Sequence, residues 1–238
     1  MKYVICSLKK GKNMKKFLIA LLLVTGCSTT TLSESVSYDK SNFAEISTVI
    51  DDAAFDIRYY SPNNFTGNKI DGYKAPRAYM SKPALKALAK AAEDLRSQGY
   101  RILVWDSYRP QKAVDNFVKW INSPHDGGDK SFYPELKKSD LLAGKYIMEK
   151  SGHTRGSTID LTIIKKDGTH VDMGGTFDLF SEISHPDYKN LTDEQKHNRK
   201  ILHDAMIRAG FTGIDSEWWH FTLKDEPYKD TYFNFDVE

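Results

Sequence analysis

Three segments of the chain repeat apolar residues with the period of an α-helix. The first follows Ser81, a residue type that caps helices, and ends before Gly99, which suits a left-handed termination. The second begins after Pro110, and the third ends at Gly210. Each segment therefore predicts a helix with one buried face. The predicted inward positions are Leu85, Leu88, Ala92 and Leu95 in the first; Ala113, Phe117 and Trp120 in the second, over Gln111 to Ile121; and Leu202, Ala205, Met206 and Ala209 in the third, over Thr192 to Ala209.

Three other segments have the character of β-strands: Ile102 to Trp105, Thr158 to Ile164, and Trp218 to Leu223. In the second, apolar and polar residues alternate, which predicts Asp160 on the polar face of a strand. Strands and helices are mixed without strict alternation, and no internal repeat or second linker interrupts the chain after Ala44. We therefore predict an α+β fold, a single domain with a central, mostly antiparallel sheet flanked by helices.

The N-terminal region has the layout of an export signal. Six lysines and no acidic residue precede the apolar run from Phe17 to Val24, which is too short to span a bilayer as a helix. The residues that end this run, Val24-Thr25-Gly26-Cys27, resemble the bacterial lipobox, in which cleavage before the cysteine leaves a thiol that carries a lipid. Residues 1–26 are therefore predicted to be a lipoprotein signal peptide, with Cys27 as the lipidation site. Because Met14 begins a typical leader, residues 1–13 are interpreted as an upstream mis-start.

Residues 27–43 are predicted to form the lipidated Cys27 and a flexible tether, because seven of the ten residues from Ser28 to Ser37 are Ser or Thr. The folded domain is then expected at 44–238. This arrangement predicts an exported protein that is held at a membrane by its lipid anchor alone.

Composition narrows the class of protein further. The 238 residues carry a formal charge of +2, and removal of residues 1–26 takes away six lysines and no acid, which leaves about −4. This balance argues against a nucleic-acid binder, and the 12% aromatic content argues against disorder. Two cysteines cannot form a disulfide framework. The sequence thus indicates a globular enzyme or binding domain, and it does not indicate an oligomeric state.

Two of the seven histidines stand in contexts suited to metal binding. His153 lies on a glycine-containing turn seven positions before Asp160, and His220 follows Glu217 by three positions. Two histidines and one carboxylate leave a tetrahedral zinc ion with an open fourth position, and this donor set fits zinc better than calcium or copper. A nearby free carboxylate can then accept a proton from water. Each piece alone is a weak signal, and the H-E-x-x-H helix is absent.

The remaining histidines have no such partner pattern and are interpreted as surface or structurally satisfied residues: His125, His170, His185, His197 and His203. Trp218 and Trp219 are interpreted as core or pocket walls.

Several longer runs, taken together and in this order, resemble the zinc D-alanyl-D-alanine dipeptidases, the family that includes the vancomycin-resistance dipeptidases. The similarity extends over roughly Ile46 to Glu238, which makes it more specific than any single motif. The runs are Asn64 to Tyr73, Trp105 to Pro110, Ser151 to Asp160, Met173 to Asp178, Glu217 to His220, and Asp225 to Tyr228 with Tyr232-Phe233.

The resemblance implies one zinc ion per chain, hydrolysis of the dipeptide D-alanyl-D-alanine, and a set of residue roles. His153, Asp160 and His220 match the zinc ligands. Glu217 matches the general base, and Arg109 matches the arginine that stabilises the oxyanion. The positions that hold the two ends of the substrate match Ser151 and Asp178.

Two residues depart from the family pattern. Thr158 stands where the family usually has alanine, and Ser107 stands where it usually has glycine. Neither replaces a metal ligand, so these departures bear on rate and substrate preference. The hydroxyl of Thr158 is expected either to bond the ligand Asp160 or to crowd the site.

One local requirement follows from strand geometry. On an ideal strand, Glu217 and His220 would point to opposite faces because they are three residues apart. For both to face one zinc ion, Glu217 must lie in an irregular entry to the strand or at a bulge.

Two alternatives to the dipeptidase stay open at this point. One is a D,D-carboxypeptidase or endopeptidase that acts on peptidoglycan, which would need an open groove. The other is a non-catalytic lipoprotein that binds the cell wall. An exported dipeptidase is expected to serve salvage or turnover of cell-wall dipeptides.

Overall fold

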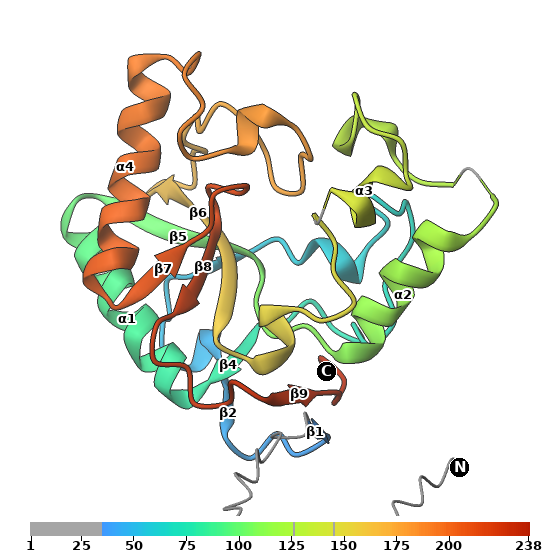
Figure 1. Ribbon diagram of the computed structural model, residues 1–238. Coiled ribbons are helices and arrows are strands. Elements are labelled where there is room, and N and C mark those ends of the chain that lie inside the picture. Colours follow the sequence, from blue (N-terminus) through green and yellow to red (C-terminus); the bar gives the residue numbers. More distant parts are fainter. Residues whose placement is uncertain (1–34, 126, 145) are drawn as a thin grey trace, which may run out of the picture. The chain divides into compact units, whose positions relative to one another are not determined.

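A computed structural model describes residues 35–125, 127–144 and 146–238 (Figure 1). The predicted signal peptide, the predicted lipidation site Cys27 and the first part of the tether lie outside the described residues. Among the described residues, no helix is both long enough and apolar enough to cross a membrane.

A five-stranded sheet forms the centre of the fold, with the order β3-β5-β6-β8-β7. Only β3 and β5 pair in parallel, and the other neighbours are antiparallel, which confirms the predicted α+β class. The strands are β3 (Ala54–Phe55), β5 (Tyr100–Asp106), β6 (Thr158–Lys165), β7 (Phe211–Gly213) and β8 (His220–Leu223).

The central strand β6 is buried on both faces. Ile159, Leu161 and Ile163 are fully buried, as the alternation predicts. The polar residues of the opposite face, Asp160 among them, are also buried. The register between β5 and β6 shifts between Val104 and Asp106, so that Asp106 comes to lie opposite Asp160. This irregularity brings two carboxylates together at one point of the sheet.

Four α-helices accompany the sheet: α1 (Lys82–Ser97), α2 (Gln111–Asn122), α3 (Asp140–Ala143) and α4 (Asp193–Arg208). Figure 1 shows α1 and α4 to one side of the sheet and α2 and α3 to the other. The three long helices match the predicted segments. Gly99 and Gly210 end α1 and α4 with φ of 93° and 97°, as predicted. Trp120, which we expected to point inward, is partly buried.

The predicted capping role of Ser81 is wrong. Ser81 occupies the N-cap position of α1, but its hydroxyl makes no capping hydrogen bond. It lies 3.0 Å from the hydroxyl of Ser157, and both side chains are buried. Pro83 in the first turn has no N–H, which leaves one donor fewer for a capping hydroxyl.

Regular structure begins earlier than the expected boundary at Ala44. A strand β1 (Ser35–Ser37) pairs in parallel with β9 (Thr231–Phe233), and β2 (Phe43–Glu45) pairs with β4 (Tyr79–Ser81). Strand pairing uses backbone groups, so the polar side chains that suggested a tether through residue 43 do not prevent it. The ring of Phe43 packs on three aromatic rings and anchors this stretch.

Short 3₁₀ helices connect the larger elements. They are η1 (Ile46–Thr48), η2 (Arg58–Tyr60), η3 (Lys130–Phe132), η4 (Gly152–Arg155) and η5 (Glu182–Ser184). Of these, η4 carries His153 into the site described next.

Candidate metal centre and its cavity

Three side chains that could bind one metal ion converge at the centre of the sheet. Asp160 lies in β6 and is paired in register with His220, the first residue of β8. His153 reaches the same point from η4, and one donor atom from each of the three side chains lies within 4.8 Å of the other two. Asp160 Oδ2 lies 3.1 Å from His153 Nε2, and Asp160 Oδ1 lies 3.0 Å from His220 Nδ1.

The surroundings of His153 orient its ring. Ser151 accepts a hydrogen bond from the backbone N–H of His153 at 3.2 Å and so caps η4, which ends at Gly156 with φ of 79°. On the ring, Nδ1 lies 2.7 Å from the carbonyl oxygen of Ser107. A carbonyl only accepts, so Nδ1 carries the proton, and the lone pair of Nε2 is left available for a metal ion. This is the protonation state that a metal-binding histidine requires.

The donor atoms fit a zinc ion. Ligands at zinc distances of about 2.0–2.2 Å in a tetrahedron are roughly 3.3–3.6 Å apart. The two facing imidazole nitrogens are 3.3 Å apart. Asp160 Oδ1 is buried and has no partner in hydrogen-bonding geometry, although His220 lies close to it. A buried acceptor without a donor, facing two imidazoles, is what a cation would satisfy.

The charge of Asp160 is stabilised in place. Burial opposes ionisation of its carboxyl group, but the two neighbouring imidazoles, when they are protonated, outweigh this effect and lower the pKa of Asp160. The side chain is therefore a carboxylate, the form that binds a metal ion.

Glu217 lies beside this trio because the chain turns before β8. The strand begins at His220, whereas Trp218 and Trp219 form a turn that the N–H of His220 closes onto the carbonyl of Glu217 at 3.3 Å. Glu217 Oε2 then lies 3.6 Å from His220 Nδ1. The predicted irregular entry to the strand is confirmed. Burial raises the pKa of Glu217 to about 7, with a further contribution from the charge of Asp160.

Arg109 lies on the other side of Asp160. Its Nη2 is 3.6 Å from Asp160 Oδ2, and both Nε and Nη2 lie 2.8 Å from Asp106 Oδ2. The guanidinium packs over the rings of Tyr59 and Phe117. Asp106 lies in the run from Trp105 to Pro110, but the sequence analysis assigns it no role. Its spacing of three residues from Arg109, at the end of a strand, is the signal that could have identified it as the residue that orients the arginine.

Asp178 comes from an irregular segment. Its φ of 56° is positive, and its buried carboxylate accepts a hydrogen bond from the hydroxyl of Tyr59 at 2.7 Å. Burial raises the pKa of Asp178 well above its ordinary value, although Tyr59 and Arg109 act in the opposite direction. Tyr59 was missed by sequence reasoning, because nothing in its local pattern distinguishes it from a core tyrosine.

One cavity of about 230 Å³ is lined by all the described residues that the sequence analysis named as metal-binding, catalytic or substrate-binding. The residues that line it include Arg109, Ser151, His153, Asp160, Asp178, Glu217 and His220. Cys27 lies outside the described residues.

The two departures from the family pattern leave this cavity intact. Thr158 does not bond Asp160, because its hydroxyl lies 2.9 Å from that of Thr222 on the neighbouring strand. It fills the space beside Gly152, where an added Cβ would come within 2.8 Å of it. Ser107 contributes its backbone carbonyl to His153, which any residue type could do.

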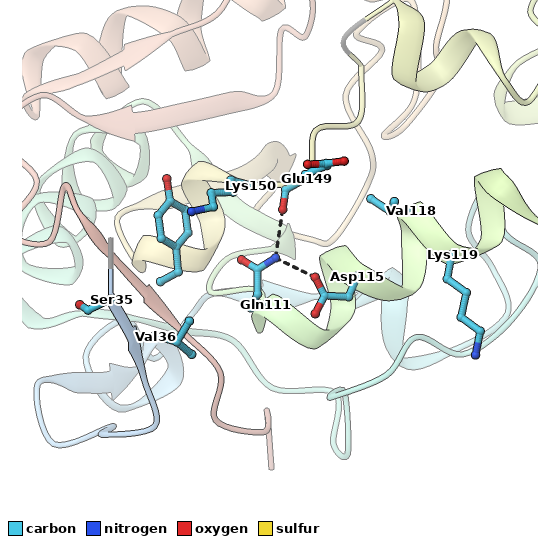
Figure 2. A pocket seen from close by; sticks show the side chains of 9 residues that line it. Ser35, Val36, Gln111, Asp115, Val118, Lys119, Glu149 and Lys150 are labelled. Atoms are coloured by element: carbon cyan, nitrogen blue, oxygen red, sulfur yellow. Dashed lines mark hydrogen bonds between the residues drawn. The ribbon is translucent and has the colours of Figure 1, made fainter. Parts of the chain in front are cut away.

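Lys150 lines both this cavity and a larger one of about 520 Å³, whose lining residues are drawn in Figure 2. Gln111 bridges Asp115 and the carbonyl of Glu149 there, at 2.9 and 3.0 Å. Figure 2 shows this amide between Asp115 of α2 and the backbone at Glu149, the residue before Lys150. The larger cavity holds none of the predicted site residues, so the chemistry belongs to the smaller one.

A metal-ligand trio with a free carboxylate and an arginine around it, set in an α+β sheet, is typical of a metal-dependent hydrolase. Comparison with known families narrows this class. The profile of Peptidase_M15, described as D-ala-D-ala dipeptidase, matches residues 39–238, and the chain belongs to this family.

Curated relatives agree over nearly their whole lengths. A D-alanyl-D-alanine dipeptidase from Streptomyces coelicolor is 39% identical over 198 residues, which cover 82% of this chain and 98% of that protein. A D-alanyl-D-alanine dipeptidase from Enterococcus faecalis is 39% identical over 200 residues, which cover 83% of this chain and 99% of that protein. One from Escherichia coli is 32% identical over 185 residues, 78% of this chain and 86% of its own.

Proposed function

We propose that this protein is a zinc-dependent dipeptidase that hydrolyses D-alanyl-D-alanine to two molecules of D-alanine. The observation that carries the proposal is the single cavity in which a zinc-type donor set, a carboxylate and an arginine meet. The relatives described as D-alanyl-D-alanine dipeptidases support the choice of substrate.

The size of the cavity favours a dipeptide over a wall polymer. Its volume of about 230 Å³ is below the roughly 300–1,000 Å³ of sites for drug-sized ligands. Bulky side chains bound it, among them Phe65, Phe117, Tyr146 and Phe180. A D,D-carboxypeptidase or endopeptidase would need room for a longer peptide, so the dipeptidase is preferred.

Two groups in the wall of the cavity suit the two ends of a free dipeptide. The Asp178 carboxylate, beside the hydroxyl of Tyr59, offers a partner for the ammonium group. Ser151 and the turn that it caps lie by His153 and offer donors for the terminal carboxylate. A small ligand offers little area, so charged groups at both ends supply much of the recognition.

The chemistry then divides among few groups. A zinc ion held by His153, Asp160 and His220 supplies Lewis-acid chemistry, which polarises a carbonyl and makes water more acidic. Glu217 takes the proton from water and returns it to the leaving amine. Arg109 uses two N–H groups on Asp106, and since a guanidinium has five N–H donors, others remain to bond the developing oxyanion.

A chelator experiment tests this function. Alanine release from D-alanyl-D-alanine should stop on metal removal and return with added zinc. L-alanyl-L-alanine and an amino-blocked D,D-dipeptide should be poor substrates. Release of D-alanine from a pentapeptide but not from the free dipeptide would favour the carboxypeptidase, and no chelator-sensitive release from any of them would favour a binding lipoprotein.

We propose further that the protein is exported and held at a membrane by a lipid on Cys27. The basic leader, the apolar run and the lipobox-like residues support this. Outside the cytoplasm, the enzyme would act on dipeptide released from the wall, which suits salvage or turnover. Cys27→Ser should move the active enzyme from the membrane fraction to the soluble fraction. Active enzyme in the cytosol, uncleaved and without lipid, would contradict the proposal.

A further inference from the structure

Arg199 is a buried cation whose hydrogen bonds all go to backbone carbonyls. It projects from α4, is 6% exposed, and donates to the carbonyl oxygens of Met173, Ile183 and His185 at 2.6, 2.8 and 3.0 Å. Burial lowers the pKa of Arg199 to about 10, against a longer-range attraction by Asp172. A buried charge is costly unless its donors are satisfied. The three hydrogen bonds to backbone carbonyls satisfy this guanidinium and hold the main chain at those points.

The three carbonyls lie at the two ends of one segment, Met173–His185, which we call the Asp178 loop. Between these ends, the loop places Asp178 and Phe180 at the cavity. Its middle is attached to η3 by the Phe180 N–H, which donates to the carbonyl of Phe132 at 2.7 Å. Within the loop, the Ser184 hydroxyl donates to the carbonyl of Leu179 at 2.6 Å. A single side chain thus joins both ends of the loop that carries the predicted ammonium partner.

Asp178 needs this support. Among the described residues, Asp178 alone has a positive φ without being glycine, and surrounding contacts must maintain this conformation. Its carboxylate is buried, and the charges of Glu217 and Asp160 disfavour it further. A loop released at either end would let the backbone relax and the carboxylate move toward water.

We propose that Arg199 is a positioning residue for substrate binding, which holds both ends of the Asp178 loop so that the Asp178 carboxylate meets the ammonium group of the dipeptide. The inference rests on the proposed dipeptidase function. All three hydrogen bonds of Arg199 go to the Asp178 loop, and none goes to His153, Asp160 or His220. The guanidinium also packs over the ring of Trp218, at 5.4 Å, but it bonds no metal ligand, so we expect its effect to fall mainly on KM and the metal to stay in place.

The first experiment compares Arg199→Met and Arg199→Lys with Arg208→Met. Arg208 lies on the same helix, but it pairs with Asp94 at the surface and its side chain is 56% exposed. A displaced binding group costs about 10- to 100-fold, so KM for D-alanyl-D-alanine should rise by about this factor in Arg199→Met. The rise should be smaller in Arg199→Lys. We expect kcat and bound zinc to stay near wild type, the loop to become more sensitive to limited proteolysis, and Arg208→Met to change none of these.

The second experiment asks whether Arg199 acts through Asp178. In a double-mutant cycle, Arg199→Met should add little to the KM of Asp178→Asn, because both remove the same interaction. The KM for N-propionyl-D-alanine, which lacks the ammonium group, should differ little between wild type and Arg199→Met. Full additivity in the cycle, or an equal loss on both substrates, would overturn the proposal.

The outcomes separate this inference from the proposed function. A wild type that shows no chelator-sensitive turnover contradicts the dipeptidase function itself. If the wild type is active, two results contradict only the role of Arg199. One is an unchanged KM in the Arg199 variants, and the other is a loss of bound zinc with a reduced kcat in those variants. If Arg199→Met does not fold, Arg199→Lys and Ser184→Ala take its place, and an unchanged KM in both overturns the inference.

Discussion

The two ends of the cavity are built in different ways. At the metal end, Asp160 and His220 sit on paired central strands, and His153 sits on a capped turn against them. At the other end, Asp178 sits in the irregular Asp178 loop, which side-chain bonds to the main chain hold in place. A sheet resists local change because its backbone bonds are shared along the strands, whereas a loop depends on a few side chains. Changes at the metal end should therefore affect the chemical step, and changes at the loop end should affect substrate binding.

The largest effect expected at the metal end is that of Glu217→Gln. The amide keeps the shape of the side chain but cannot accept a proton, so kcat should fall by about 10³-fold while zinc stays bound. Turnover and metal content measured on one preparation test this. Glu194→Gln, at an exposed residue outside the Asp178 loop, is the matched control and should leave turnover unchanged. Near-normal turnover in Glu217→Gln would remove the proton-transfer role.

The counterpart at the loop end is Asp178→Asn. The hydroxyl of Tyr59 can still donate to the amide oxygen, but the negative charge is lost, so KM should rise by about 10- to 100-fold with kcat much less affected. Steady-state kinetics separate the two constants. Asp187→Asn, at a side chain that is 80% exposed, is the control. A fall in kcat with KM unchanged would break the division between the two ends.

A smaller effect is expected where the C-terminal segment supports the turn of His153. Arg155 donates two hydrogen bonds to Glu226, at 2.9 and 2.8 Å, and the pair is largely buried. Glu226→Gln should lower the free energy of unfolding by about 1–3 kcal/mol, because a buried guanidinium loses its charged partner. Thermal unfolding measures the loss. Glu238→Gln, in the exposed pair with Lys40, should change the free energy of unfolding little. An equal loss of stability in Glu226→Gln and Glu238→Gln would show that the turn does not depend on Arg155.

The smallest effect is expected for Thr158→Ala, which restores the residue type that we take as usual for the family. The variant loses the hydrogen bond to Thr222 and a methyl group, so unfolding should become easier by no more than about 1–2 kcal/mol. Since Thr158 does not bond Asp160, kcat and KM should stay close to wild type. A large change in either constant would show that this hydroxyl affects the metal end after all.

Much of the fold could be predicted because its signals are local. The stripe of α1, the left-handed Gly99 and the position of Thr192 before α4 all reflect preferences of neighbouring residues. Thr192 even forms a capping box with Gln195. The prediction failed for the Ser81 hydroxyl and for β1, because Ser157 and β9, their partners, come from distant parts of the chain.

For the site, the metal-binding and catalytic residues at the metal end could be predicted from the sequence. The contacts that orient them could not. His153, Asp160, Glu217 and His220 stand in runs with recognisable spacing. The carbonyl of Ser107 that orients His153 lies 46 residues away from it along the chain, and a backbone carbonyl leaves no trace in residue type. Tyr59 and Asp178 are 119 residues apart, so no local pattern could pair them.

The sequence by itself determined where helices and strands form, which side chains could bind a metal ion, and that one glutamate had to leave the regular strand. These follow from backbone preferences and from donor chemistry, which each residue carries with it. Only the tertiary structure decided that the bulge in β5 sets Asp106 against Asp160 and Arg109, and that Arg199 closes the Asp178 loop. Such contacts join residues far apart in the chain, and packing selects them because buried polar groups must find partners wherever the folded elements bring them.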